Sequence, residues 1–228
     1  MRHFNLICFH AFESEDILLV MELYLPKPFS YNTYLFERDL ATILTEFLLA
    51  ARIPAYLYPF LSSTETELPF ELLRINSLGV IDALIKDDDP QVIHFLLESE
   101  IFPLCLRCME LGHETSKQVA ALTVSKILQQ QQGLYYCGAF VDRFYAVAHV
   151  LRRVVDNLPE NPQPPLLRNI VRCYLLLTKM PRASGALRRC FPASLTDGTF
   201  TNILREDPQT MRHLQHLLYK VNLGHGSN

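Results

Sequence analysis

The chain has 228 residues, of which 49% are hydrophobic and 20% are charged, and its formal net charge is −3. This balance is that of a globular protein long enough for one core or one stack of repeats, and it excludes wholesale electrostatic attraction to nucleic acid. The charge is unevenly distributed, because residues 62–100 carry nine acidic residues against Arg74 and Lys86, whereas residues 141–191 carry nine basic residues against three acidic ones.

The cysteines and one apolar run near the N-terminus indicate a reduced, intracellular protein. The apolar run, residues 17–21, is flanked by acidic residues, is too short to span a bilayer and lacks the basic start of a secretory signal. We therefore expect no membrane partner. The cysteines all lie in apolar or helical stretches, without the spacing of a disulfide scaffold: Cys8, Cys105, Cys108, Cys137, Cys173 and Cys190.

Three regions are expected along the chain. Residues 1–46 form an atypical N-terminal segment, with weak helices predicted at 13–25 and 34–49 around the loop PKPFSYNTY. Residues 47–222 form a helical repeat domain, in which apolar residues recur at helical spacing. Residues 223–228 are expected to be a disordered tail.

The best-defined stretch is residues 69–109, which predicts a helix, an acidic turn, a second helix, a turn and a third helix. Pro69 follows the acidic loop SSTETEL and suits the first turn of a helix expected at 70–86. Asp89 then precedes Pro90, a pattern that predicts an N-cap followed by proline at the first helical position.

The three consecutive aspartates, Asp87 to Asp89, allow a second interpretation. Carboxylates bind hard cations, but no further ligands follow here at the regular spacing of a calcium loop. A solvated cap and turn is therefore favoured over a metal site.

Several more helices are predicted after this stretch. The polar residues Gln129 to Gln132, with Gly133, are expected to form the exit from the first of them, and the linker PENPQPP separates the second from the third. The predicted helices span residues 114–128, 140–157, 166–180, 181–191, 200–205 and 208–221.

Internal sequence repeats indicate an α-solenoid. FLLAARIP at 47–54 returns as FLLESEIFP at 95–103, and a shift of 43 residues pairs Ile81 with Val124, Leu84 with Ile127, Ile85 with Leu128 and Ile101 with Phe144. Periods in the forties are typical of armadillo and HEAT units, which bury their apolar faces only against the next unit. The predicted fold class is therefore all-α, an armadillo-like α-solenoid of stacked helical repeats. Its core is expected to contain Leu78, Ile81, Leu84, Phe95, Leu96, Ile101 and Leu104.

No motif in the sequence indicates catalysis. It lacks a glycine-rich phosphate loop, a GxSxG elbow and an HExxH pair. Cys105 and Cys108 spell CLRC, but a four-ligand zinc site needs a second pair, so they are expected to be small buried or flanking residues. We expect no enzymatic activity, no metal and no cofactor, and a binding surface is the first functional expectation.

The basic half of the chain offers two interpretations. Its arginines lie on successive helices, which a solenoid would bring side by side along one ridge or groove, where RNA could bind by counterion release and stack on Tyr145 or Tyr174. Alternatively, the arginines pair with acids of neighbouring helices or of a partner protein. The candidate nucleic-acid contacts are Arg152, Arg153, Arg168, Arg172, Arg188 and Arg189, within a set that also includes Arg143, Lys179 and Arg182.

From residue 47 to about residue 218 the chain resembles the family called "required for cell differentiation", the armadillo-type subunit of the CCR-NOT deadenylase complex. The resemblance rests on these stretches: IPAYLYPFL, PFELLRINSLGVIDALIK, VIHFLLESEIFPLCLRCME, SKQVA, LLRNIVRCYLLLTKMPRASGALRRCFP and FTNILREDPQTMRH.

The resemblance implies a non-enzymatic scaffold or adaptor in mRNA deadenylation, mRNA decay and translational repression. The implied partners are the large scaffold subunit of the complex, peptide motifs of mRNA-decay regulators and single-stranded nucleic acid. RNA and a second copy of the chain are further candidate partners. The implied locations are the cytoplasm, the nucleus and P-bodies. The alternatives are a single-stranded nucleic-acid-binding protein that uses the basic residues 143–189, a generic armadillo interaction module outside that complex, or a degenerate copy with no retained partner.

Two departures from the family pattern qualify these expectations. Residues 1–46 do not resemble the helices that precede the matched region in full members and that help to contact the large scaffold subunit. This predicts a shortened, plant-like or divergent paralogue, or a gene model with a wrong first exon. In addition, the tyrosine, arginine and histidine that help to form a tryptophan-accepting peptide pocket in animal members correspond here to Val141, Arg143 and Ala146. That pocket is therefore expected to be weakened or to bind different ligands.

Overall fold

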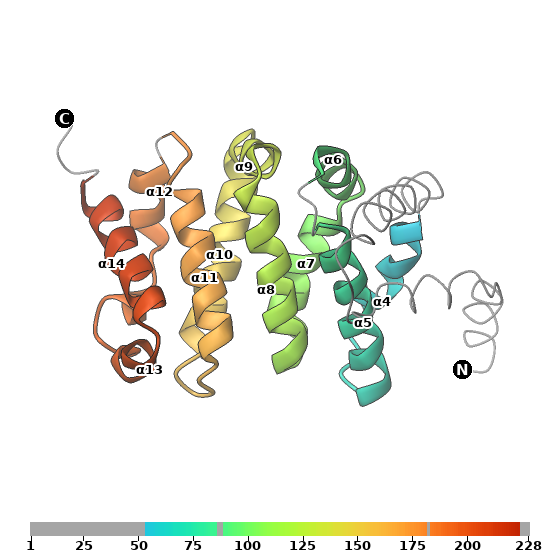
Figure 1. The fold of residues 1–228 in the computed structure, drawn as a ribbon, viewed down its shortest axis with the longest axis horizontal. Coiled ribbons are helices and arrows are strands. Elements are labelled where there is room, and N and C mark those ends of the chain that lie inside the picture. The colour runs from blue at the N-terminus through green and yellow to red at the C-terminus, as the bar shows by residue number, and fades with distance from the viewer. Residues whose placement is uncertain (1–52, 86–88, 182, 224–228) are drawn as a thin grey trace, which may run out of the picture. The chain divides into compact units, whose positions relative to one another are not determined.

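The computed structural model describes residues 53–85, 89–181 and 183–223, which belong to one compact unit spanning residues 45–228. Every regular element in these ranges is a helix, and the protein is an all-α helical-repeat solenoid (Figure 1). The helices predicted at 13–25 and 34–49, and most of the FLLAARIP segment, lie outside the described residues. So do Asp87, Asp88 and Arg182.

The helices after Pro69 begin and end close to the predicted positions. Their order is η1 Ile53–Leu57, α4 Tyr58–Ser62, α5 Leu68–Leu84, α6 Pro90–Glu98, α7 Ile101–Leu111, α8 Glu114–Gln129, α9 Gln131–Gly138, α10 Val141–Asn157, α11 Pro164–Leu177, α12 Ala183–Cys190, η2 Ala193–Leu195, α13 Thr201–Glu206 and α14 Pro208–Leu223.

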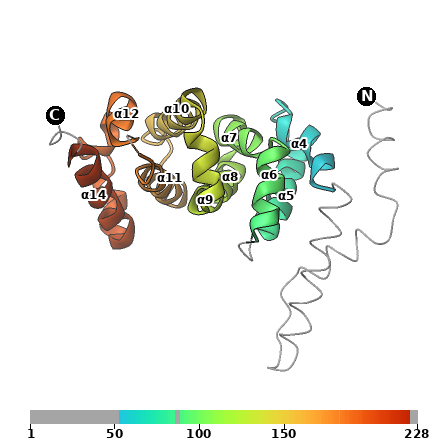
Figure 2. The same cartoon turned by 90° about the horizontal axis from the view of Figure 1, so that it is seen from above.

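The helices stack in rows. One row consists of α5, α8, α11 and α14, each of which packs on the next (Figure 1). A second row consists of α4, α7, α10 and α12, and it lies behind the first (Figure 2). The short helices α6 and α9 pack together along one edge of the stack. Residues 90–129 and 131–177 therefore form successive units of three helices each. Each unit has one short helix at the edge, then one helix of the second row and one helix of the first row.

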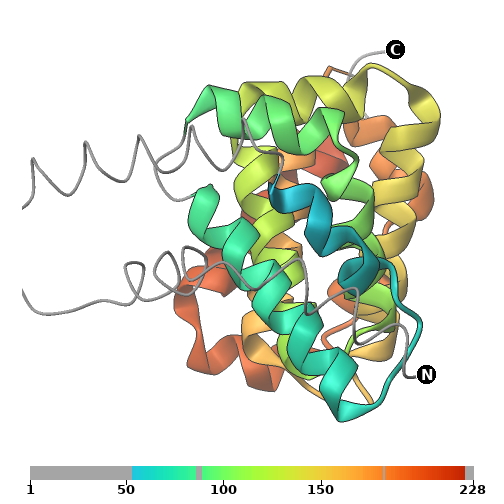
Figure 3. The ribbon, with the colours of Figure 1, turned by 90° about the vertical axis from the view of Figure 1, so that its right-hand side faces the viewer.

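Figure 3 looks along the stack from its α4–α5 end. The 43-residue shift pairs residues that occupy equivalent positions in neighbouring units along this direction. Ile81 and Val124 lie on α5 and α8, and Ile101 and Phe144 lie in the first turns of α7 and α10. All four are buried. The repeat in the sequence thus corresponds to packing of like helix on like helix.

The predicted core residues separate into two groups. Leu78, Ile81, Leu84, Leu96 and Ile101 are buried. Phe95 and Leu104, in contrast, are only half-buried, so their placement in the core was wrong. The buried stripe of α6 runs through Val92, Ile93, Leu96 and Leu97, and that of α7 runs through Ile101, Cys105, Cys108 and Met109, which leaves Phe95 and Leu104 on the flanks.

Helix α9 was not predicted from the sequence. The glutamines and Gly133, which were interpreted as a polar exit from α8, instead start α9 at Gln131 after a one-residue break at Gln130. Gly133 makes this close junction possible, because a Cβ at this position would lie 2.0 Å from the carbonyl oxygen of Ile127. A glycine inside the first turn hides the helical pattern from sequence rules, since glycine disfavours helices.

The predicted cap of α6 is present. Asp89 has extended backbone angles, its side chain accepts a hydrogen bond of 2.8 Å from the N–H of Gln91, and Pro90 is the first helical residue. The carboxylate therefore satisfies an N–H group that the helix itself cannot pair.

Replacing Asp89 by alanine is expected to lower the free energy of unfolding by about 1 kcal/mol, because that N–H loses its partner. Urea unfolding of Asp89→Ala measures the loss. Asp89→Asn is the matched control, since asparagine caps as well and should retain most of the stability. Equal losses in both variants would show that the capping hydrogen bond is not the cause.

Candidate functional site

The described surface has a hollow with a volume of about 940 Å³ at the edge where α6 and α9 pack together. Residues of α6, of the α6–α7 turn, of α9 and of the start of α10 line it. Two successive repeat units thus build the hollow jointly, so its shape depends on the stacking of the solenoid.

Part of the lining is a cluster of Tyr136, Phe140 and Arg143. The Cζ atom of Arg143 lies 4.0 Å from the centre of the Tyr136 ring and 4.7 Å from that of Phe140. Such placement is a cation–π interaction, which stabilises the guanidinium over the rings. The Tyr136 ring in turn meets the buried Phe102 edge-on, with 5.7 Å between ring centres. The cluster is therefore anchored in the core on one side and open to solvent on the other, where Phe140 is exposed.

Burial raises the pKa of the Tyr136 hydroxyl, and the charge of Glu100 adds to this shift, whereas Arg143 opposes it. Tyr136 is therefore a neutral phenol at physiological pH, able both to donate and to accept a hydrogen bond.

Acidic and aromatic side chains also line the hollow. Glu98 pairs with His94 one helical turn away, with 3.2 Å between oxygen and nitrogen. Glu100 lies in the α6–α7 turn, where its φ of 61° is in the left-handed region. Tyr135, which also lines the hollow, is 78% exposed. Aromatic and arginine side chains together with polar residues are typical of protein-recognition hot spots.

The residues that were predicted to form a peptide groove are only partly brought together here. Val141, Arg143 and Ala146 all lie on the first half of α10. Arg143 lines the hollow, but Val141 is 70% exposed outside it and Ala146 is also exposed and not part of its lining. Tyr136 and Phe140 were missed. They lie seven and three residues ahead of Arg143, and this spacing was the available signal. For Tyr136 it was obscured because α9 was not predicted.

The basic residues lie on helices of both rows. Arg152, Arg153, Arg188 and Arg189 belong to α10 and α12 in one row, whereas Arg168 and Arg172 belong to α11 in the other. Consecutive helices occupy different rows in this fold, so the six arginines are divided between two rows. Tyr174, which was proposed as a stacking face, is fully buried and cannot stack on a base; Tyr145 is half-buried on α10.

Most of these arginines also have partners within the protein. Arg153 pairs with Glu110, Arg152 lies 3.4 Å from Asp156, Arg168 lies 2.8 Å from Asp207, and Arg172 donates to the side-chain oxygen of Gln129 at 2.5 Å. Hydrogen bonds from the hydroxyl and the N–H of Thr210, together with Arg168, lower the pKa of Asp207 to about 2. The contact between Arg168 and Asp207 is therefore an ion pair throughout the physiological pH range.

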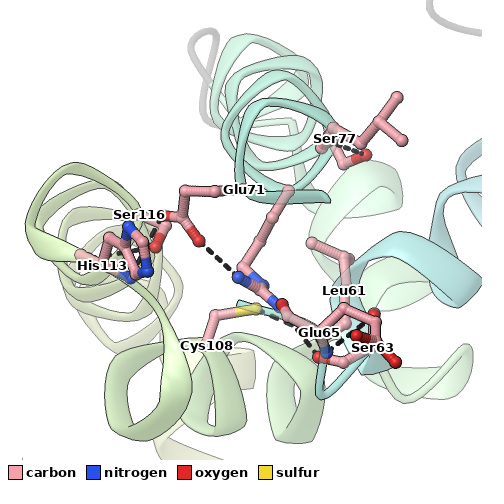
Figure 4. Close-up of polar contacts among 10 residues, drawn as sticks. Leu61, Ser63, Glu65, Glu71, Ser77, Cys108, His113 and Ser116 are labelled. Atoms are coloured by element: carbon pink, nitrogen blue, oxygen red, sulfur yellow. Dashed lines mark hydrogen bonds and ion pairs between the residues drawn. The ribbon is translucent and has the colours of Figure 1, made fainter. Parts of the chain in front are cut away.

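A buried polar cluster joins α5 to its neighbours (Figure 4). Arg74 and Glu71 form an ion pair although their side chains are only 1% and 3% exposed. Arg74 also donates to the carbonyl oxygens of Ser63, at 2.8 Å, and Glu65, at 3.1 Å, and Glu71 accepts from the N–H of His113 at 3.1 Å. The cluster thus connects the α4–α5 loop to the turn before α8.

Burial alone would raise the pKa of Glu71, but hydrogen bonds from Ser116, Arg74 and the His113 backbone, together with the charge of Arg74, lower it below its ordinary value. The pair is therefore charged at neutral pH. It is an internal structural element, because its groups face one another and the protein backbone.

Cys105 and Cys108 are both buried in α7 as free thiols. Burial raises the pKa of Cys108 to about 11, so the thiol is protonated and a poor metal ligand or nucleophile. Among the described residues, no group of three or more histidine, cysteine, aspartate or glutamate side chains is placed to hold a metal ion. In the same part of the chain, no helix has the length and apolar character needed to cross a membrane.

Comparison with known proteins gives a consistent family relationship. Residues 41–221 match the family model described as "Cell differentiation family, Rcd1-like". The "Cell differentiation protein rcd1" of Schizosaccharomyces pombe is 49% identical over 173 residues, which cover 76% of this chain and 61% of that protein. "Protein CAF40" of Saccharomyces cerevisiae is 47% identical over 175 residues, which cover 76% of this chain and 47% of that protein. The match thus spans about half to three fifths of the length of these curated relatives.

Proposed function

Because the chain belongs to the Rcd1-like cell differentiation family, we propose that it is a non-enzymatic adaptor subunit of a CCR-NOT deadenylase complex, acting in mRNA deadenylation, mRNA decay and translational repression. The observation that carries the proposal is the family match across residues 41–221, which covers most of the described solenoid. A stack of repeats offers extended surfaces on several rows of helices, which suits a protein that holds partners together. Its proposed assembly partner is the large scaffold subunit of the complex, and its proposed location is the cytoplasm and nucleus, including P-bodies.

The hollow between α6, α9 and α10 is the proposed site for peptide motifs of mRNA-decay regulators. Arg143 is held over Tyr136 and Phe140 before any ligand arrives, so little conformational entropy is lost when a flat side chain stacks on the cluster. The tyrosine and histidine of the family's tryptophan-accepting pocket are replaced here by Val141 and Ala146. In our proposal Tyr136 and Phe140 supply the aromatic surface in their place.

A tryptophan-containing peptide from a decay regulator tests this site. The protein contains no tryptophan, so the fluorescence of the peptide's own indole reports its burial directly. Arg143→Ala is expected to weaken binding about tenfold, or ~1.4 kcal/mol, because it removes the cation that organises both rings.

Arg152→Ala is the matched control, since Arg152 lies on the same helix and pairs only with Asp156 among the described residues. It should leave the affinity unchanged. Two results would contradict the proposed site: equal affinity of Arg143→Ala and wild type, or equal affinity of the peptide in which tryptophan is replaced by alanine.

RNA binding is the competing function, and the internal partners of Arg152 and Arg153 do not favour it. Strongly salt-dependent binding to poly(U) that is lost in Arg152→Glu/Arg153→Glu would favour RNA over peptide capture. We expect weak binding that the double variant barely changes.

A further inference from the structure

The loop between α4 and α5 carries a run of hydroxyl and acidic residues that the proposed function does not use. Its sequence from residue 62 to 67 is SSTETE, and residues 63–66 form neither helix nor strand. The backbone is extended at both ends, with φ and ψ of −59° and 137° at Ser63 and of −64° and 149° at Glu67. An extended, exposed segment is the form in which enzymes that modify proteins bind their substrates.

The four hydroxyl groups of this loop are not equivalent. Ser62 donates to the carbonyl oxygen of Pro59 at 3.4 Å. The Ser63 hydroxyl accepts from the N–H of Glu65 at 3.1 Å, and this residue is half-buried. Thr64 and Thr66 are exposed, and neither hydroxyl has a hydrogen-bond partner within the described part of the chain. The two threonine hydroxyls are therefore free, whereas that of Ser62, which is exposed and has Glu65 three positions on, is engaged with the Pro59 carbonyl.

The neighbouring carboxylates distinguish the two threonines. Thr64 is followed by Glu65 at the next position and by Glu67 three positions on, whereas the third residue after Thr66 is Pro69. Both glutamates are exposed, and their carboxylates have no ion-pair partner among the described residues. They are available to lysines and arginines of an enzyme that selects acidic sequences, through charge-assisted hydrogen bonds.

The loop is also held in place by the buried Arg74. Arg74 donates to the carbonyl oxygens of Ser63 and Glu65, the residues on either side of Thr64. Since Arg74 is buried, these bonds hold the loop against α5, while Thr64 between the two bonded residues stays exposed. We propose that Thr64 is a phosphorylation site for a protein kinase that selects acidic substrates.

The transfer needs only ATP and the kinase. The Thr64 Oγ1 attacks the γ-phosphorus of MgATP, a new P–O bond forms, and the bond from the γ-phosphorus to the bridging oxygen breaks to release ADP. The hydroxyl proton passes to the kinase's catalytic carboxylate and then to solvent. The product carries an added charge of about −1.5 to −2 at pH 7. This charge would lie a few residues before Leu68 and Leu72, which are exposed at the start of α5, and so would change that surface for any partner.

The test uses the full chain with casein kinase II, an acidophilic serine/threonine kinase, and MgATP. Intact-mass measurement followed by fragmentation should find one phosphate, on Thr64. Thr64→Val should abolish incorporation, Thr64→Ser should restore it, and Thr66→Val should leave it unchanged. Glu67→Gln should slow the reaction about tenfold, because one charge-assisted contact is lost.

Three results would overturn the proposal: no incorporation into the folded protein, incorporation at Thr66 or Ser62 with Thr64 unmodified, or an equal rate for Glu67→Gln. Cyclic-AMP-dependent kinase, which selects basic sequences, is the counter-probe and should leave Thr64 unmodified. Thermal melting of Thr64→Val and Thr66→Val should match that of wild type, since both side chains are exposed. Phosphorylation of Thr64 does not depend on whether the proposed peptide site at Arg143 is correct.

Discussion

Ile81→Asp is expected to lower the free energy of unfolding by about 4–5 kcal/mol, a large part of the whole stability of a typical domain. Ile81 is completely buried on α5, which packs against α8 in the first row of helices. An aspartate there would place a carboxylate among apolar side chains without a partner, so it would remain charged at a high cost or become protonated. Chemical denaturation at pH 7 measures the loss directly.

The control for Ile81→Asp lies on the same helix. Leu72 is 51% exposed, and Leu72→Asp introduces the same carboxylate where water can solvate it. The control should change the stability by no more than about 0.5 kcal/mol. A melting temperature for Ile81→Asp equal to that of wild type, or equal losses in the two variants, would show that the buried face of α5 is misplaced.

The second large effect is expected at Arg74. Arg74→Met removes the buried cation and leaves Glu71 without its counter-charge, which should cost about 3–5 kcal/mol at pH 7. The side chain of methionine fills a similar volume, so lost charge and hydrogen bonds, not a cavity, dominate the effect. The double variant Glu71→Gln/Arg74→Met should recover part of the loss, because no buried charge remains.

The pH dependence of Arg74→Met separates this cause from general loss of packing. In the wild type the pKa of Glu71 is lowered from 4.5, so its contribution is present above pH 4.5 and is lost as the pH falls through the lower folded value. In the variant, burial without the arginine is expected to raise the pKa of Glu71. The deficit relative to wild type should then be largest at neutral pH and shrink as the pH falls. A deficit that is independent of pH, or a double variant as unstable as the single one, would contradict this explanation.

The local features of the fold could be predicted from the sequence. Pro69 lies in the first turn of α5, and Asp89 and Pro90 begin α6, as proline and capping patterns indicated. Helix α8 begins at Glu114, as the helical spacing of its apolar residues indicated. These signals act over a few residues, so a single sequence is enough to detect them. The 43-residue sequence repeat could also be detected, because equivalent helices pack on one another and have similar apolar faces.

The features that depend on how helices are arranged could not be predicted. Whether an arginine on α10 lies near one on α11 depends on the row to which each helix belongs, and this is set by packing between units. The same ambiguity placed Tyr174 on the surface, although it is buried. Glu71 and Arg74 are three residues apart, and nothing local indicates that the loop at Ser63 and the N–H of His113 enclose them.

The candidate hollow was predicted only in part. Arg143 was identified through a family resemblance, whereas Tyr136 and Phe140, which hold it, were not. The helix of Tyr136, α9, starts with glutamines and Gly133, a composition that propensity rules assign to a turn, and the close approach of Gly133 to Ile127 is a tertiary reason for the glycine. Binding sites built by two repeat units are in general less visible in a sequence than the repeats themselves.

Co-purification tests the central claim most directly. The full chain, tagged and expressed in cells, should capture deadenylase subunits and the large scaffold subunit of the CCR-NOT complex, and the unstable variant Ile81→Asp should not. Failure of the folded wild-type protein to capture any subunit of that complex, at low salt and with circular dichroism showing native helix content, would contradict the assignment.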